Sequence, residues 1–285
     1  MKRDSIDNTA TRLSGLSAHA RGKPARCFEW RASADRDHPA QAHGLLSLAG
    51  HPLLAQLSDE QRWRLGLAEM THFFSLNIAG ERMLLEGLGH QLAGGHCSGA
   101  TSGYLRHVIE EECAHTEVFE TFCRRYAGKI YRDRQLRFPR RVLPGEAEFL
   151  VFAQMLVFEE ISAWFNRKLA ADRDVWPLVR DINEYHAAEE ARHLVFGRAM
   201  VESLWEASSP GWAEEGRARI AKYVRAYVRS TLRSYVDPDV YVDAGVPGDA
   251  FALREEVLAS DGWRQIEAAA TKRLDATLTG LGMAR

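Results

Sequence analysis

The fold is decided by the stretch Tyr185-His186-Ala187-Ala188-Glu189-Glu190-Ala191-Arg192-His193, which lies inside a long segment with the apolar spacing of a helix. His186, Glu190 and His193 stand at positions i, i+4 and i+7 of this segment. On an α-helix, which turns once about every 3.6 residues, these three side chains project from one face. Two imidazoles and a carboxylate stacked in this way are typical of a metal-binding face.

A second motif, Glu112 to His115, repeats the Glu-x-x-His spacing of Glu190 and His193 on an earlier helical segment. One such motif alone often arises by chance among the charged residues of an exposed helix. Here both motifs fall on inner faces, while the neighbouring Glu111 falls mostly on the outer surface. Two Glu-x-x-His motifs, with one Glu from each of two further helices, form the dinuclear metal site of ferritin-like bundles.

Two further segments each carry an acid within an apolar surface. Glu81 shares one helical stripe with Phe74, Ile78 and other apolar residues. A carboxylate in such a place is unfavourable unless it is paired or bound to a metal. The other acid is Glu159 or its neighbour Glu160, and the helical phase favours Glu159 only slightly. A salt bridge to a buried arginine is the alternative for both helices.

The apolar pattern predicts four long helices, at about residues 67–92, 102–126, 146–169 and 175–205. Ser58 to Gln61 has the pattern of a capping box, which predicts a short helix before the first of them. The connection 128–144 is basic, contains prolines and is longer than the others, so we predict an irregular crossover there. Residues 214–235 predict another amphipathic helix, followed by a loop at 237–248 and further helical pattern to residue 281.

We therefore predict an all-α protein, a ferritin-like four-helix bundle with additional N- and C-terminal helices. Residues 1–45 have little apolar periodicity and are expected to form a peripheral or partly disordered arm. Residues 46–285 are expected to form one domain, with the bundle at about 67–206 and covering helices at about 212–281. We expect a pocket between the four helices, lined by side chains that are otherwise ordinary core residues: Phe74, Asn77, Leu84, Leu85, Val108, Phe119, Phe152 and Met155.

The composition excludes several other classes of protein. Lys and Arg number 37 against 39 Asp and Glu, and the net charge of -2 gives no reason to expect a nucleic acid. The N-terminus lacks the apolar stretch of a signal peptide, and no run approaches the roughly 18 apolar residues of a membrane span. The four cysteines contain no C-x-x-C pair, which fits a reducing cytoplasm. We expect a cytoplasmic protein without nucleic-acid or membrane partners. Apolar helix faces outside the bundle are compatible with a homodimer.

The arrangement His186-x-x-x-Glu190-x-x-His193, within His-Ala-Ala-Glu-Glu-Ala-Arg-His, resembles the p-aminobenzoate N-oxygenases, non-haem di-iron enzymes of natural-product pathways. The resemblance extends over about residues 50–245, and its distinctive mark is the third histidine. Glu159 precedes His186 by 27 residues, a step similar to that of the family, which favours Glu159 over Glu160. The resemblance implies seven metal ligands: Glu81, Glu112, His115, Glu159, His186, Glu190 and His193.

The resemblance further implies two iron ions, O2 as co-substrate, an external electron donor, and oxidation of a small-molecule amine toward a hydroxylamine or nitro compound. Ligand type alone does not separate manganese from iron. A di-iron C-hydroxylase or desaturase shares six of the ligands, and the third histidine favours the N-oxygenase. Iron storage is a further alternative, which the C-terminal helices disfavour. No catalytic residue beyond the ligands is predicted, and Glu189 and Arg192 are expected to contact the ligands or to join helices.

Overall fold

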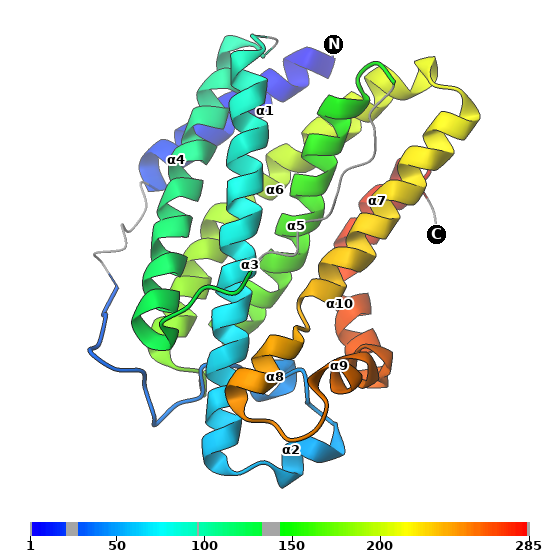
Figure 1. The fold of residues 1–285 in the computed structure, drawn as a ribbon. Helices are drawn as coiled ribbons and strands as arrows, with labels where there is room; N and C mark the ends of the chain where they lie inside the picture. Colours follow the sequence, from blue (N-terminus) through cyan, green and yellow to red (C-terminus); the bar gives the residue numbers. More distant parts are fainter. Residues whose placement is uncertain (1, 21–27, 96, 133–142, 284–285) are drawn as a thin grey trace.

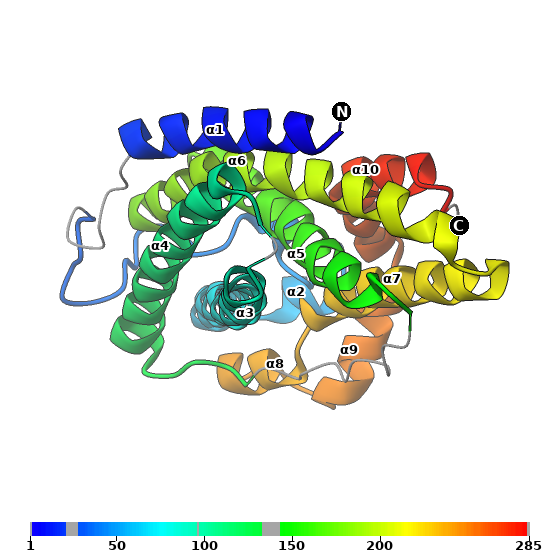
Figure 2. The same ribbon diagram turned by 90° about the horizontal axis from the view of Figure 1, so that it is seen from above.

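The computed structural model describes residues 2–20, 28–95, 97–132 and 143–283, and this part of the chain contains helices and no strand. This confirms the all-α prediction. Figure 1 shows the arrangement, and Figure 2 looks along the central helix. The bundle consists of four long helices: α3 (Asp59–Ala93), α4 (Gly99–Phe122), α5 (Glu146–Ala171) and α6 (Pro177–Ser208).

The helix ends follow local sequence signals. Ser58 and Gln61 form the predicted capping box, in which each side chain accepts a hydrogen bond from the backbone N–H of the other. This box opens α3 itself, so the short helix predicted to begin after Ser58 is the first part of α3 and not a separate element. Pro177 occupies the first turn of α6, where its missing N–H costs nothing. A π-helical turn at Cys123–Ala127 follows α4 and ends at Gly128, whose φ is 68°.

The N-terminal segment differs from the expected arm, because helix α1 (Lys2–Ala20) packs across α4 and α6 (Figure 2). Its buried face consists of Ala10, Leu13 and Ser17, a stripe too sparse and too small to stand out in the sequence. The Arg192 guanidinium of α6 donates a hydrogen bond to Ser17 Oγ over 3.0 Å. The helix is therefore joined to α6 through the residue that directly precedes the predicted ligand His193.

The C-terminal helices lie outside the bundle, as Figure 1 shows. Helix α7 packs along α5, and the bidentate pair between Arg219 and Glu146 links them at 2.8 Å. The loop predicted at 237–248 is wrong in part, because Asp237 caps a short helix there. The helices after the bundle are α7 (Glu214–Ser234), α8 (Pro238–Ala244), α9 (Ala250–Ala259) and α10 (Asp261–Gly280).

Two segments lie before and between the helices of the bundle. Helix α2 (Pro52–Gln56) is a short element before α3. Most of the basic connection predicted at 128–144 lies outside the described residues, since residues 133–142 are not among them. Within the described part of the chain, no helix combines the length and the apolar character that crossing a membrane requires.

Candidate metal centre

Seven side chains from the four bundle helices meet in the core. Helix α3 contributes one of them, α4 two, α5 one and α6 three. Each of these residues is 2% exposed or less, although all seven are polar or charged. These are the residues that the sequence and the resemblance predict as ligands: Glu81, Glu112, His115, Glu159, His186, Glu190 and His193.

The seven side chains form two groups that could each hold a metal ion. In the first, ligand atoms of Glu81, His115, His186 and Glu190 lie within 4.8 Å of one another. In the second, atoms of Glu112, Glu159, Glu190 and His193 do so. Glu190 belongs to both groups, as a carboxylate that bridges two ions would.

The atoms that face these groups lack ordinary hydrogen-bond partners. Both carboxylate oxygens of Glu159 and of Glu190 are buried without one, and so are Nε2 of His186 and Nδ1 of His193. Several of them are close together without good hydrogen-bond geometry, for example His193 Nδ1 at 2.8 Å from Glu112 Oε1. Buried polar atoms are rarely left unpaired. Nitrogen and oxygen donors converging in this way fit a pair of metal ions.

Each of the three histidines uses its second ring nitrogen to contact a residue outside the two groups. Glu189 lies 2.9 Å from Nε2 of His115, and Glu111 lies 2.7 Å from Nε2 of His193. Such partners fix the orientation and the tautomer of a metal-binding imidazole. The contact of Glu189 confirms the expectation that it supports the ligands.

The third histidine has an amide as its partner. The side-chain amide of Asn166 lies 2.6 Å from Nδ1 of His186. Since a half turn exchanges the amide oxygen and nitrogen, Asn166 can accept the Nδ1 proton and leave Nε2 free for a metal. Asn166 is also 3.5 Å from Ser162 Oγ, which donates to Asn77 on α3 over 2.6 Å. This polar chain connects His186 with α5 and α3.

Two carboxyl groups of the centre have strongly raised pKa values in the protein without metal. Burial raises the pKa of Glu81 and of Glu159 well above the ordinary range. The neighbouring carboxylates of Glu112 and Glu190 raise them further. Crowded carboxyl groups in a buried space therefore need protons or metal cations to coexist.

Histidine protons supply part of that positive charge. Burial alone would lower the pKa of His115, but the Glu112 carboxylate raises it to about 9. Burial and the charge of Glu112 would raise the pKa of Glu190, but His193 and His186 lower it to about 2. Metal ions would replace these protons, because a metal-bound imidazole uses the lone pair that otherwise holds the proton.

The structure separates Glu159 from Glu160, which the helical phase could not do. Glu160 faces Arg198 on α6, and Nε and Nη2 of this arginine lie 2.7 Å and 2.6 Å from its Oε1. Glu159 lies in the second group. Of these two adjacent acids, Glu160 is therefore the one that forms a salt bridge with an arginine.

Glu111 is a functional candidate that the helical phase misplaced. Its side chain is only 11% exposed and reaches across to α6, where it contacts both His193 and Arg192, each at 2.7 Å. The expected surface position is therefore wrong. A charged Arg192 next to a buried histidine on α6 is the only signal in the sequence for such a partner. No signal in the sequence identified Asn166 as the partner of His186.

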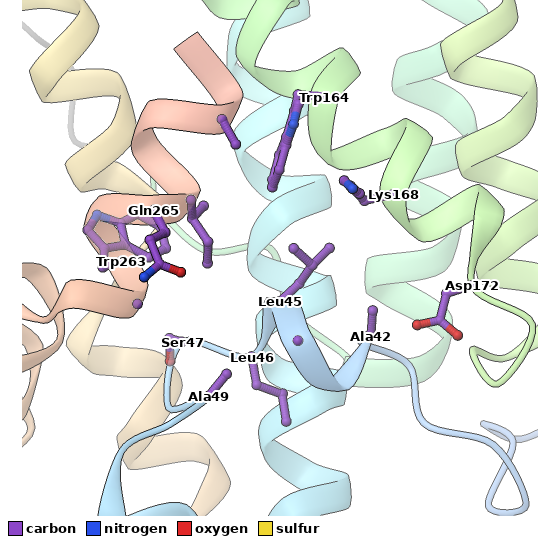
Figure 3. A pocket seen from close by; sticks show the side chains of 14 residues that line it. Ala42, Leu45, Leu46, Ser47, Ala49, Trp164, Lys168, Asp172, Trp263 and Gln265 are labelled. Atoms are coloured by element: carbon purple, nitrogen blue, oxygen red, sulfur yellow. The ribbon is translucent and has the colours of Figure 1, made fainter. Parts of the chain in front are cut away.

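Where the pocket was expected between the helices, described side chains pack closely. Phe74 and Phe119, for instance, stack with their ring centroids 4.9 Å apart and are almost fully buried. A cavity of about 430 Å³ lies instead on the outer side of α5, between Trp164 and Trp263, which project into it from α5 and α10 (Figure 3). None of the seven candidate ligands lines this cavity.

Comparisons with known proteins agree with this geometry. Residues 3–282 match the model of the family described as "P-aminobenzoate N-oxygenase AurF". An uncharacterized protein of Mycobacterium tuberculosis (strain CDC 1551 / Oshkosh) is 24% identical over 196 residues, 67% of this chain and 56% of the relative. One of Mycobacterium bovis (strain ATCC BAA-935 / AF2122/97) is 25% identical over 154 residues, 52% and 45% of the two chains. The chain spans about half the length of these relatives.

Solved structures with the same fold include R2-like ligand-binding oxidases. A tyrosine-to-phenylalanine mutant with an aerobically reconstituted Mn/Fe cofactor is 14% identical, with a TM-score of 0.51 over 91% of this chain and 93% of that chain. A form with the same cofactor after a long soak is 13% identical, with a TM-score of 0.50 over 91% and 92%. These similarities confirm the ferritin-like fold. The family match over nearly its whole length shows that this chain belongs to the p-aminobenzoate N-oxygenase AurF family.

Proposed function

We propose that this protein is a non-haem di-iron oxygenase that uses O2 to N-oxygenate a small amine, most simply an aryl amine, in a natural-product pathway. The observation that carries the proposal is the buried pair of donor groups that share Glu190 and include the third histidine, His186. Family membership supports the same chemistry. The third histidine favours N-oxygenation over C-hydroxylation or desaturation, which need only six ligands.

In this proposal one ion is held by Glu81, His115 and His186, and Glu190 contributes to both ions. Glu112, Glu159 and His193 complete the shell of the other ion. A bound iron pair would supply the electrons and the coordination sites for reducing O2. The mixture of imidazole and carboxylate donors suits iron, and it suits manganese almost as well. The solved oxidases with a Mn/Fe cofactor are a reason to test both metals.

The protein's own residues would position the donors and keep water away. Glu189, Glu111 and Asn166 orient the three imidazoles through their outer nitrogens. The ligands are 2% exposed or less, so bulk water does not reach them in this conformation. Excluding water protects a reactive centre from side reactions.

The overall reaction needs a source of electrons. Conversion of an amine to a hydroxylamine by O2 takes up two electrons and two protons, and it yields the hydroxylamine and one water. The described chain contains no flavin or haem motif that would supply these electrons, so an external electron-transfer partner is part of the proposal.

Metal analysis followed by a product assay tests this function. The protein would be loaded with iron(II), or with iron(II) and manganese(II), without oxygen and then desalted. We expect about two metal ions per chain. The loaded protein would then receive labelled O2, a chemical reductant and a set of aryl and alkyl amines. Mass spectrometry should detect one labelled oxygen on nitrogen.

A protein that binds no metal after loading would overturn the assignment of all seven ligands. Oxygen on carbon would shift the function to C-hydroxylation.

A further inference from the structure

A cleft of about 360 Å³ lies on the side of α3 that faces away from α4, between α3, α5 and α7. Figure 1 shows the three helices that line it, α3 in cyan, α5 in green and α7 in yellow to orange. Its volume is in the range of small-molecule sites. The residues that carry the following argument are His72, Leu76, Gly80, Met83, Phe158 and Tyr227.

The floor of this cleft lies next to the candidate metal centre. Gly80 lines the cleft and directly precedes Glu81 on α3. Phe158 lines it as well and directly precedes Glu159 on α5. On each of the two helices, one residue thus lines the cleft and the next residue belongs to the metal groups. The seam between α3 and α5 is therefore a short path from the cleft to both groups.

Phe158 closes this seam by lying against the backbone of α3. A Cβ atom added to Gly80 would lie 2.2 Å from two atoms of the Phe158 ring, so a larger residue at position 80 would displace the ring. About one turn away, the hydrogen bond from Ser162 to Asn77 joins the same two helices. The seam between α3 and α5 is thus closed by the Phe158 ring at the level of the ligands and by the Ser162–Asn77 hydrogen bond about one turn away.

The lining of the cleft suits a molecule with an apolar body. Leu76 and Met83 lie on one wall, and Tyr227 of α7 faces Met83 with its hydroxyl 3.7 Å from the sulfur. Polar groups also line the cleft, for example His72, which is 4.0 Å from Asp237. Phe158 is 8% exposed, whereas the ligands next to it are 2% exposed or less. Its ring is therefore the boundary between cleft and metal centre.

We propose that the cleft between α3, α5 and α7 binds the amine substrate, and that the ring of Phe158 determines how large a molecule crosses the α3–α5 seam to the metal centre. This inference rests on the proposed function, because the occupant is the amine of that reaction. The side chain of Phe158 must turn away from Gly80 for the amine to pass. Phe158 is thus a residue that determines specificity.

Phe158→Ala and a matched variant test the route. Phe149→Ala is the control, because Phe149 is a buried ring on the same helix that does not line the cleft and packs against Trp205 and Trp212. The first measurement is the rate at which the bulky aromatic chelator ferrozine removes iron(II) from the loaded proteins. We expect Phe158→Ala to speed removal about tenfold or more, equivalent to about 1.4 kcal/mol of barrier, and Phe149→Ala to change it little.

The second measurement is the preference among amines of increasing width, such as aniline and 1-naphthylamine. We expect Phe158→Ala to shift the preference toward the wider amine. If Phe158→Ala does not fold, Phe158→Leu retains part of the packing and should give a smaller change of the same sign. Equal rates of iron removal in the two alanine variants would overturn the inference, since α5 would then simply be loosened.

The two proposals fail in different ways. If Phe158→Ala alone releases iron faster but no variant oxidises any amine, the route is supported and the proposed function fails. If amines are oxidised with the same size preference and iron leaves at the same rate in every variant, the function is supported and the route through Phe158 fails.

Discussion

Glu159 and Glu160 are adjacent on α5 and equally buried, at 2% exposed, but their surroundings differ. Glu160 is paired with the guanidinium of Arg198. Neither oxygen of Glu159 has a hydrogen-bond partner, and the carboxylate of Glu190 lies in the same group. A buried carboxylate needs a cation, a proton or several donors. The partner, and not the degree of burial, therefore separates the acid that joins helices from the acid that is free to bind a metal.

Replacing the shared carboxylate should have the largest effect. In Glu190→Ala both groups lose a donor, so we expect almost complete loss of bound metal and of oxygenation. Metal analysis after anaerobic loading would measure this. Glu184→Ala is the matched control, because Glu184 is an exposed acid on the same helix. Two ions retained in Glu190→Ala would show that the groups do not share this residue.

The adjacent pair on α5 can be tested directly. In Glu159→Gln we expect the metal content to fall toward about one ion per chain, because the second group loses an anionic donor. In Glu160→Gln the metal content should stay unchanged, while the free energy of unfolding falls by about 1–2 kcal/mol. The loss is moderate because the Arg198 side chain is 30% exposed and water partly replaces its partner. Metal analysis and urea unfolding of both variants would check this, and the reverse pattern would exchange the two roles.

Glu69 is a third kind of buried acid, one whose partners are neutral donors. The backbone N–H and the hydroxyl of Ser47 donate to its Oε1 over 2.9 Å and 2.6 Å. Burial nevertheless raises the pKa of Glu69 from 4.5 to about 7, because the Ser47 hydrogen bonds only partly compensate for lost hydration. The folded protein therefore holds this proton more tightly than the unfolded chain does.

Glu69 therefore makes the stability of the folded protein depend on pH. The stability that protonated Glu69 contributes is complete below about pH 4.5, declines as the pH rises to about 7, and is absent above it. The wild-type protein should lose up to roughly 3 kcal/mol over this interval relative to Glu69→Gln, whose side chain stays neutral. Urea unfolding of both metal-loaded proteins from pH 5 to 8 would measure the difference. A difference that does not vary with pH would mean that a neutral Glu69 is not favoured by the fold.

The smallest expected effect concerns the partner of the third histidine. Asn166→Ala should weaken binding of the ion next to His186 by about 10- to 100-fold, because the imidazole loses the group that fixes its tautomer. Asn166→Asp should restore much of the affinity, since its carboxylate also accepts the Nδ1 proton. Competition with a chelator would measure the affinities. Asn183→Ala is the control, because that buried amide on the same helix as His186 donates its hydrogen bond to the carbonyl of Val179.

The sequence was sufficient to predict the four long helices of the bundle and the candidate metal-binding side chains that converge from them. Apolar periodicity located α4 to α7 to within a few residues, because an amphipathic helix repeats its pattern over several turns, whereas α3 begins at Asp59, well before the predicted start at about 67. The spacing of His186, Glu190 and His193 predicted a common face, and the structure places His186 in the first group, His193 in the second and Glu190 in both. A ligand face is predictable because it depends on the phase of one helix.

Partners from neighbouring helices were not predictable in this way. Glu111 reaches His193 although it lies off the inner stripe of α4, because a long side chain bridges to an adjacent helix. The role of Asn166 depends on the approach of α5 to α6 at one position. Helix α1 was missed because its buried face, including Ala10 and Ser17, carries little apolar signal. Such contacts depend on how two helices pack, which the period of one segment does not contain.

The donor set also determines a charge balance. The two groups contain four carboxylates, and two divalent cations would neutralise them when all four are ionised. A centre with one divalent ion would retain two uncompensated negative charges in a medium of low polarity, and one with two trivalent ions would carry two positive charges. Both states are poorly solvated in a protein core. If the centre holds metal as proposed, electroneutrality of the donor set would therefore favour loading with two divalent ions.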